Sequence, residues 1–281
     1  MKEIIHFSHA NGFPASVYRT IFAELADQFD VRAIETIGHD PRYPVTRDWQ
    51  HLTDELLASV DSGAGAGEAP HPVWLVGHSL GGYLSLLAGL RKPQRVRGVV
   101  MLDSPVIGGW RGHLLRVFQW TGLDESLSPA AATKSRRTRW ASRDEAWRHF
   151  HSKPAFARWD ERMLSDYIDH GTAKVDAVGM RELVFDRDTE YRIYRTIPHT
   201  IGARVTRGAA VPVGFLAGTK SREMQQVGLD ATRRLVGDRL EWVEGSHLFP
   251  MERPIETARA IQRMLTRLGQ LERAKTPVHR G

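Results

Sequence analysis

Short apolar runs with the length of a β-strand recur along the chain and alternate with segments of helical periodicity. The runs are Ile4–Phe7, Val31–Ile37, Val73–Val76, Val96–Leu102, Val211–Leu216 and Leu240–Val243. Several of them are continuously apolar, which is typical of strands that are covered by helices on both faces. The alternation of strands with helices predicts an α/β fold with a mainly parallel, doubly wound sheet.

Three segments place apolar residues three and four positions apart, which predicts amphipathic helices. The first spans Val17–Leu25, the second spans Trp49–Val60, and the third opens at Pro254 and extends through Leu268. Proline suits the first position of a helix because an N–H group there would have no partner within the helix.

The alternation breaks over residues 106–200, where the pattern shows helix signals but no convincing strand. Ser142-Arg-Asp-Glu145 has the spacing of a capping box, and five of the eight tryptophans of the chain fall in this segment. We predict that residues 106–200 form a helical cap, or lid, inserted into an α/β core made of residues 1–105 and 201–273. Residues 274–281 are expected to form a flexible tail.

Composition narrows the classes of function. Hydrophobic residues make up 41% and charged residues 26% of the chain, as in ordinary soluble proteins. The net charge is +6 and the isoelectric point is about 9.8, but no nucleic-acid-binding motif is present, so no nucleic-acid partner is expected. The basic run Lys134–Arg139 is interpreted as a solvated helix face, with steering of an anionic substrate as the alternative.

The sequence contains no cysteine, which excludes disulfides, thiolate catalysis and cysteine-bound metal. It has no run of 18 apolar residues and no signal-peptide pattern at its start, so we expect a cytoplasmic protein without a membrane span. The sequence does not specify an oligomeric state. The Gly/Ala-rich stretch 63–70 is expected to be a flexible surface loop.

The most informative motif is Gly77-His78-Ser79-Leu80-Gly81, which fits G-x-S-x-G between an apolar run and a small-residue helix. In such an elbow the serine adopts a strained backbone conformation, and glycines are needed because side chains at positions 77 and 81 would collide across the turn. The following helix directs its unpaired N–H groups and positive dipole end toward the serine. The motif predicts that Ser79 is a nucleophile.

The chain resembles the α/β-hydrolase family over nearly its whole length. His9-Ala10-Asn11-Gly12 lies directly after the first predicted strand, where the family usually has His-Gly-x, and Tyr18 falls nine residues after His9, where many members carry an aromatic residue. The resemblance implies that the backbone N–H groups of Asn11 and Leu80 form an oxyanion hole, which stabilises the negative charge of a tetrahedral intermediate.

The resemblance also places the catalytic histidine after the last strand. His247 follows Leu240–Val243 in the expected loop and is therefore assigned as general base and then general acid. The histidines near the other motifs are interpreted as structural or solvent-facing. They are His6, His9, His39 and His78.

Two residues are candidates for the acid that orients His247. Family members usually carry it in a Gly-x-x-Asp pattern after the next-to-last strand, but this sequence has Gly218-Thr-Lys-Ser221 there. Asp103 is favoured, since it ends the strand that follows the nucleophile and some relatives carry their acid at that place. Glu223 is the alternative. Asp40, which replaces a glycine of the family's Gly-His-Gly loop, is given no catalytic role.

These features predict a serine hydrolase that cleaves a carboxylic ester or thioester of a small or medium apolar substrate through an acyl-enzyme. Carbon–carbon bond hydrolysis, acyl transfer and perhydrolysis by the same triad remain alternatives, as does a non-catalytic ligand receptor on this fold. No cofactor and no metal are expected, because HEXXH is absent and His149 and His151 would point to different faces of a helix.

Overall fold

A computed structural model describes residues 2–62, 71–108, 133 and 136–275 of the chain. Its core is a six-stranded sheet with the strand order β2-β1-β3-β4-β8-β9, in which every neighbouring pair is parallel. The strands are β1 (Glu3–Ser8), β2 (Phe29–Ala33), β3 (Val73–His78), β4 (Val96–Leu102), β8 (Val213–Gly218) and β9 (Leu240–Val243). The predicted parallel α/β sheet is confirmed.

Two of the predicted strands differ at both ends from the observed ones: Val31–Ile37 is observed as Phe29–Ala33, and Val211–Leu216 as Val213–Gly218. β2 ends at Ala33 rather than Ile37, because the Ile37 N–H donates to His9 Nε2 (2.8 Å) instead of to a neighbouring strand. β8 begins at Val213 rather than Val211, because Pro212 has no N–H group to pair and contributes only its carbonyl, which accepts from Val99 N–H.

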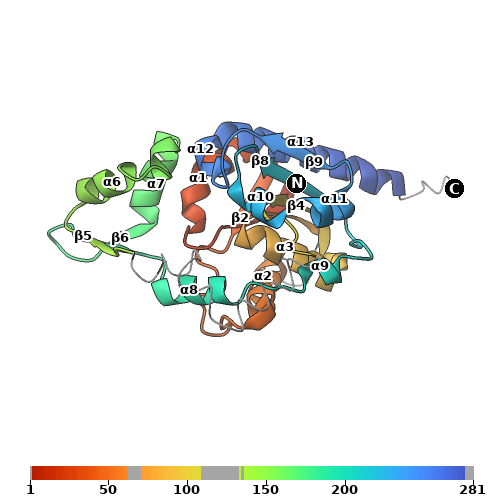
Figure 1. Cartoon of the computed structure of the whole chain (residues 1–281), viewed down its shortest axis with the longest axis horizontal. Helices are drawn as coiled ribbons and strands as arrows, with labels where there is room; N and C mark the ends of the chain where they lie inside the picture. Colours follow the sequence, from red (N-terminus) through yellow and green to blue (C-terminus); the bar gives the residue numbers. More distant parts are fainter. Residues whose placement is uncertain (1, 63–70, 109–132, 134–135, 276–281) are drawn as a thin grey trace.

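Helices cover both faces of the sheet (Figure 1). The helices of the core are α1 (Arg19–Leu25), α2 (Gln50–Ser62), α3 (Leu80–Arg91), α9 (Ile201–Arg204), α10 (Arg222–Val227), α11 (Asp230–Val236), α12 (Phe249–Glu252) and α13 (Pro254–Lys275). Helices α1 and α13 pack on one face, where Phe7 and Val76 are buried. Helices α2, α3 and α11 pack on the other face, where Leu75 and Phe215 are buried.

The sheet therefore has a separate apolar layer on each side. This arrangement requires successive strand residues to face opposite layers, so both sides of each strand are apolar. Among the described helices, none has both the length and the apolar character of a membrane-spanning segment.

The sequence pattern indicated a purely helical segment between β4 and β8, and this prediction was wrong in part. It contains α6 (Arg143–His151), α7 (Glu161–His170) and α8 (Arg187–Arg195), but also a small antiparallel sheet. The strand order of that sheet is β5-β7-β6, with β5 (Arg139–Trp140), β6 (Thr172–Lys174) and β7 (Arg181–Leu183). Strands of two or three residues are too short to show an alternating pattern in a sequence.

The aromatic residues of this segment build its interior. Trp140 and Trp159 are buried, and rings of Phe150, Phe156 and Tyr167 lie within 6 Å of one or both of them. Figure 1 shows α6 and α7 at one end of the molecule, with α7 beside α1. Trp110 and Trp120 lie outside the described residues.

The predicted capping box at the start of α6 is present in modified form. The Ser142 side chain accepts from the Glu145 N–H at 3.1 Å, as expected of an N-cap. The Glu145 carboxylate accepts from the Ala141 N–H at 2.6 Å, one residue before the cap, so the return bond reaches further back than the usual motif.

Some of the other predictions concern residues that the structure does not describe. The loop 63–70 and Lys134 are among these residues, and so are residues 276–281 of the predicted tail. Helix α13 continues to Lys275, so Ala274 and Lys275 belong to the helix and not to a tail. Arg136 of the basic run is not a solvated residue: its guanidinium is mostly buried and pairs with Glu190 at 2.8 Å.

The turn from β3 to α3 depends on glycines that let backbones approach closely. A Cβ atom on Gly77 would lie 2.2 Å from the backbone of Gly81, which confirms the predicted collision across the turn. A Cβ atom on Gly81 would lie 1.9 Å from the carbonyl oxygen of Ser8 in β1, so this glycine is needed for packing against the neighbouring strand.

We expect Gly81→Ala to lower the free energy of unfolding by roughly 3 kcal/mol, because the methyl group would push the elbow away from β1. Gly269→Ala is the matched control, since a Cβ atom there would meet nothing nearer than 3.7 Å and alanine favours a helix by about 1 kcal/mol over glycine. Urea unfolding of both variants measures the difference. Equal stability of the two variants would contradict the packing argument.

Candidate active site

Ser79 sits between the last residue of β3 and the first residue of α3. Its backbone has φ 53° and ψ −113°, a conformation that costs of order 1–3 kcal/mol for a residue with a side chain. Two hydrogen bonds hold it there: the Ser79 N–H donates to Leu102 O (2.9 Å), and the Ser104 hydroxyl donates to Ser79 O (2.8 Å). Neighbouring elements therefore hold a strained serine at the carboxyl edge of the sheet.

His247 lies in the loop between β9 and α12, and its Nε2 atom is 3.0 Å from Ser79 Oγ. The loop is anchored by Glu252, whose carboxylate accepts from the N–H and the hydroxyl of Ser246 at 3.0 and 2.6 Å. Gly245 has φ 134°, and a Cβ atom there would approach Glu252 to 2.6 Å. The structure thus brings together the predicted nucleophile and the predicted base from residues 168 positions apart.

Asp103 is the carboxylate nearest to His247. Its Oδ2 lies 2.8 Å from His247 Nδ1, whereas Glu223 Oε2 lies 3.9 Å from the same nitrogen. The Asp103 side chain is fully buried, but that of Glu223 is 45% exposed. The geometry favours Asp103 over Glu223, because only Asp103 is at hydrogen-bond distance and shielded from water.

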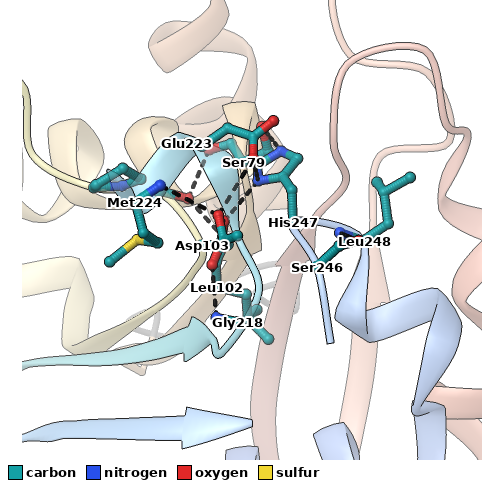
Figure 2. A network of polar contacts seen from close by, with 12 residues as sticks. Ser79, Leu102, Asp103, Gly218, Glu223, Met224, Ser246, His247 and Leu248 are labelled. Carbon is teal, nitrogen blue, oxygen red and sulfur yellow. Dashed lines mark hydrogen bonds and ion pairs between the residues drawn. The ribbon is translucent and has the colours of Figure 1, made fainter. Parts of the chain in front are cut away.

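The buried Asp103 carboxylate has its own donors, as a desolvated charge requires. The Gly218 N–H donates to Oδ1 at 2.7 Å, and the Ser221 hydroxyl donates to Oδ2 at 2.5 Å. Ser221 holds the position at which the resemblance placed an acid, and its hydroxyl instead donates to Asp103, the residue that directly follows β4. Figure 2 shows Asp103 at the centre of this network, between Gly218 and His247.

Both ring nitrogens of His247 have partners, and these define its protonation. The carboxylate of Asp103 only accepts, so Nδ1 carries the proton, and Nε2 is left to accept from the Ser79 hydroxyl. Burial on its own would lower the pKa of His247, but the hydrogen bond to Asp103 and the charges of Asp103 and Glu223 outweigh it and raise the pKa above its ordinary value. The ring is thus a base whose conjugate acid the site stabilises.

The side chains of Asp103, Glu223 and His247 also form a group of possible metal ligands among the described residues, with ligand atoms within 4.8 Å of one another. His247 Nδ1 already donates to Asp103, however, and Nε2 faces Ser79. Both ring nitrogens of His247 therefore have hydrogen-bond partners, which is an arrangement for proton transfer between Ser79 and His247.

Of the two residues predicted to form the oxyanion hole, Leu80 begins α3 and Asn11 lies in the loop after β1. Leu80 is the first residue of α3, where helix N–H groups have no partner within the helix, and among the hydrogen bonds between described residues none uses the N–H of Leu80 or Asn11. His9 Nδ1 lies 2.8 Å from Ala10 O, which orients the peptide group that carries the Asn11 N–H. The Asn11 side chain is buried and donates to Glu190 O at 3.0 Å.

Two features of the site were missed in the sequence. Ser221 and the Gly218 N–H serve as donors to Asp103, and their only signal was the absence of an acid in the Gly218–Ser221 segment. Glu190 and its ion-pair partner Arg136 approach the loop of Asn11, since a Cβ atom on Gly12 would lie 2.7 Å from Glu190 Oε1. No sequence pattern connected that pair to the loop, because it comes from the segment between β4 and β8, far from the loop in the chain.

Comparisons with known proteins agree with this architecture. Residues 7–260 match the model of a family described as the alpha/beta hydrolase family. E-2-(acetamidomethylene)succinate hydrolase aligns with a TM-score of 0.74 at 20% identity, covering 95% of this chain and 92% of that one. A comparison with curated protein sequences gave no match.

Two further solved structures are similar. The thioesterase domain from the curacin biosynthetic pathway aligns with a TM-score of 0.68 at 14% identity, covering 93% of this chain and 91% of that chain. The esterase Rv0045c of M. tuberculosis aligns with a TM-score of 0.65 at 17% identity, covering 94% and 86%. At these identities the likeness concerns the fold.

The titration of His247 tests the geometry without any assumption about activity. We expect a pKa above the ordinary histidine value in the wild type, a large decrease in Asp103→Asn and a smaller one in Glu223→Gln, because only Asp103 forms the short bond and is buried. Histidine NMR titration of the three proteins gives the order. A larger decrease of the His247 pKa in Glu223→Gln than in Asp103→Asn would contradict Asp103 as the main partner of His247.

Proposed function

Because the chain belongs to the alpha/beta hydrolase family, we propose that it is a serine hydrolase that cleaves a carboxylic ester or thioester through an acyl-enzyme. The observation that carries the proposal is the continuous line of hydrogen bonds from Ser79 Oγ through His247 to the buried carboxylate of Asp103. A serine hydroxyl is a weak nucleophile, and an adjacent base held in this way is what activates it.

In the first half of the reaction, Ser79 Oγ attacks the carbonyl carbon while His247 Nε2 takes the hydroxyl proton. The imidazolium that forms is stabilised by the charge of Asp103, which stays ionised. The Asn11 and Leu80 N–H groups donate to the oxyanion, and removing one donor of this kind costs about 3 kcal/mol of transition-state stabilisation in related chemistry. The start of α3 adds a positive dipole end at the same place.

In the second half, the protonated His247 delivers its proton to the leaving alcohol or thiol, and the acyl group remains on Ser79. Water then attacks the acyl-enzyme with His247 again acting as base, and breakdown of the second tetrahedral intermediate releases the acid and restores the serine hydroxyl. The proton of the Ser79 hydroxyl thus leaves with the alcohol or thiol, and the attacking water supplies, through His247, the proton that restores Ser79.

Residues 106–200 are proposed to act as a cap over the site. Contacts with the His247 region support this: the Asp160 N–H donates to Met251 O at 2.9 Å, and Arg158 pairs with Glu252 at 3.2 Å. Phe13, which follows the Asn11 loop, packs against Trp159 with ring centroids 5.7 Å apart. The aromatic pair of Phe13 and Trp159 supports a small or medium apolar substrate, and the esterase and thioesterase neighbours support the bond type.

A fluorophosphonate probe tests the proposal. We expect stoichiometric labelling of Ser79 in the folded protein, located by mass spectrometry of the modified peptide, together with hydrolysis of short-chain p-nitrophenyl esters and thioesters. Ser79→Ala should lose both, and heat-denatured protein should not be labelled. Ester turnover that is equal in wild type and Ser79→Ala, with no label on Ser79, would favour the non-catalytic receptor.

The two candidate acids are separated by kinetics. We expect Asp103→Asn to reduce kcat/KM by roughly 10³-fold or more, because the neutral amide cannot stabilise the imidazolium. Glu223→Gln should reduce it by less than about threefold, since an exposed charge 3.9 Å away is screened by water. Steady-state hydrolysis of one ester by both variants gives the comparison, and a reversed order would assign the acid to Glu223.

The pH dependence follows from the raised pKa of His247. Only the neutral ring accepts the Ser79 proton, so kcat/KM should fall as the pH drops through a midpoint above the ordinary histidine value. Glu223→Gln removes one of the charges that raise this pKa, so it should shift the midpoint to lower pH without abolishing turnover. A pH–rate profile for both proteins tests the direction.

A further inference from the structure

A chain of buried hydrogen bonds connects the loop of Asn11 to the loop of His247. The Ala10 N–H donates to the Tyr18 hydroxyl oxygen at 3.1 Å, and the Tyr18 oxygen lies 2.8 Å from His78 Nδ1. On the other side of the same ring, His78 Nε2 lies 2.9 Å from His247 O. Two side chains outside the proposed triad thus bridge the proposed oxyanion donor and the proposed base.

The groups at the two ends determine which atom donates in each hydrogen bond of this series. A carbonyl only accepts, so His78 Nε2 carries the proton that is donated to His247 O. A backbone N–H only donates, so the Tyr18 oxygen accepts from Ala10 and directs its own proton to His78 Nδ1. Each donor has one acceptor, and His78 is held as a neutral ring with its proton on Nε2.

Burial keeps these groups in that state. His78 and Tyr18 are completely buried, and burial together with the nearby His247 lowers the pKa of His78 to about 3. Burial also raises the pKa of Tyr18 far above its ordinary value. Neither group changes charge near neutral pH, so the bridge keeps one arrangement while His247 itself titrates.

We propose that Tyr18 and His78 are positioning residues that set the Asn11 N–H and the His247 ring at fixed places on either side of Ser79. Ala10 is clamped on both sides, by Tyr18 at its N–H and by His9 at its carbonyl, and that carbonyl belongs to the peptide group of the Asn11 N–H. His78 directly precedes Ser79, so the nucleophile lies next to the bridge. The inference rests on the proposed function.

The two halves of the bridge are separable by substitution. Tyr18→Phe and His78→Gln both break the Tyr18–His78 bond, while the glutamine amide retains a donor for His247 O. We expect each to lower kcat roughly tenfold with little change in KM, because a small misplacement of a donor to the transition state weakens catalysis more than binding. The midpoint of the pH profile should stay as in the wild type.

His78→Asn should keep the bond to Tyr18 and lose the bond to His247 O. Its amide oxygen stands near the former Nδ1 and accepts from Tyr18, but the side chain is too short to donate to His247 O. The His247 loop then loses a support, and its ring should move away from Asp103. We expect the midpoint of the pH profile to shift to lower pH in this variant.

The double variant Tyr18→Phe/His78→Gln completes a double-mutant cycle with the two single variants. Both substitutions break the same bond, so the double variant should be little slower than the slower single variant. Multiplying losses would show two independent structural effects and would overturn the proposal, as would wild-type kcat in Tyr18→Phe.

Ser59→Ala is the control for a simple loss of stability. It removes the partner of another buried histidine, His6, whose Nε2 lies 2.9 Å from Ser59 Oγ. His6 faces α2, on the side of β1 opposite to Phe7 and Tyr18. We expect a lower Tm in Ser59→Ala with unchanged kcat and KM.

NMR of ¹⁵N-histidine-labelled protein separates failure of this inference from failure of the proposed function. Wild type that hydrolyses no ester would contradict the proposed function alone. The proposal for the bridge still predicts a neutral His78 with its proton on Nε2 from pH 5 to 8, and a change in the His247 signals in His78→Asn. A proton on His78 Nδ1, or unchanged His247 signals, would contradict the bridge even in an active enzyme.

Discussion

The hydrogen bond between His247 Nδ1 and the buried Asp103 carboxylate is the interaction on which the rest of the site depends. It fixes which nitrogen of the ring carries the proton and leaves the other to face Ser79. A buried carboxylate is costly unless donors surround it, and the Gly218 N–H and the Ser221 hydroxyl fill that role here. The end of β8 is therefore part of the site although it supplies no acid.

A second constraint is the close approach of backbones around the elbow. Ser79 takes a strained conformation at a turn where a Cβ atom on Gly77 would collide with the backbone of Gly81, and one on Gly81 with the backbone of Ser8. Asp103 also has a positive φ, of 48°, at the end of the adjacent strand β4. Strain at these two positions is sustained by the surrounding sheet, and it places both side chains at the same edge.

The segment between β4 and β8 contacts the loop of Asn11. Arg136 and Glu190 form a largely buried ion pair, and Glu190 O accepts from the Asn11 side chain. The charge of Arg136 is thus already compensated, which weakens the interpretation of the basic run as an anion-steering patch and connects it to the order of the Asn11 loop. A buried pair of this kind contributes little net stability, but losing one partner leaves an uncompensated charge.

Local patterns in the sequence determined much of this protein. Continuous apolar runs determined the parallel sheet, and the glycines around Ser79 determined the elbow, because both depend on neighbours in the chain. The tertiary structure decided which carboxylate meets His247, since Asp103 and Glu223 are both near the right strand ends and differ only in distance and burial. It also placed His78 between the Tyr18 hydroxyl and the carbonyl of His247, which lies 169 positions from His78 in the chain. Contacts of that range depend on how β1, β3 and the loop after β9 meet at one edge, and no local periodicity encodes them.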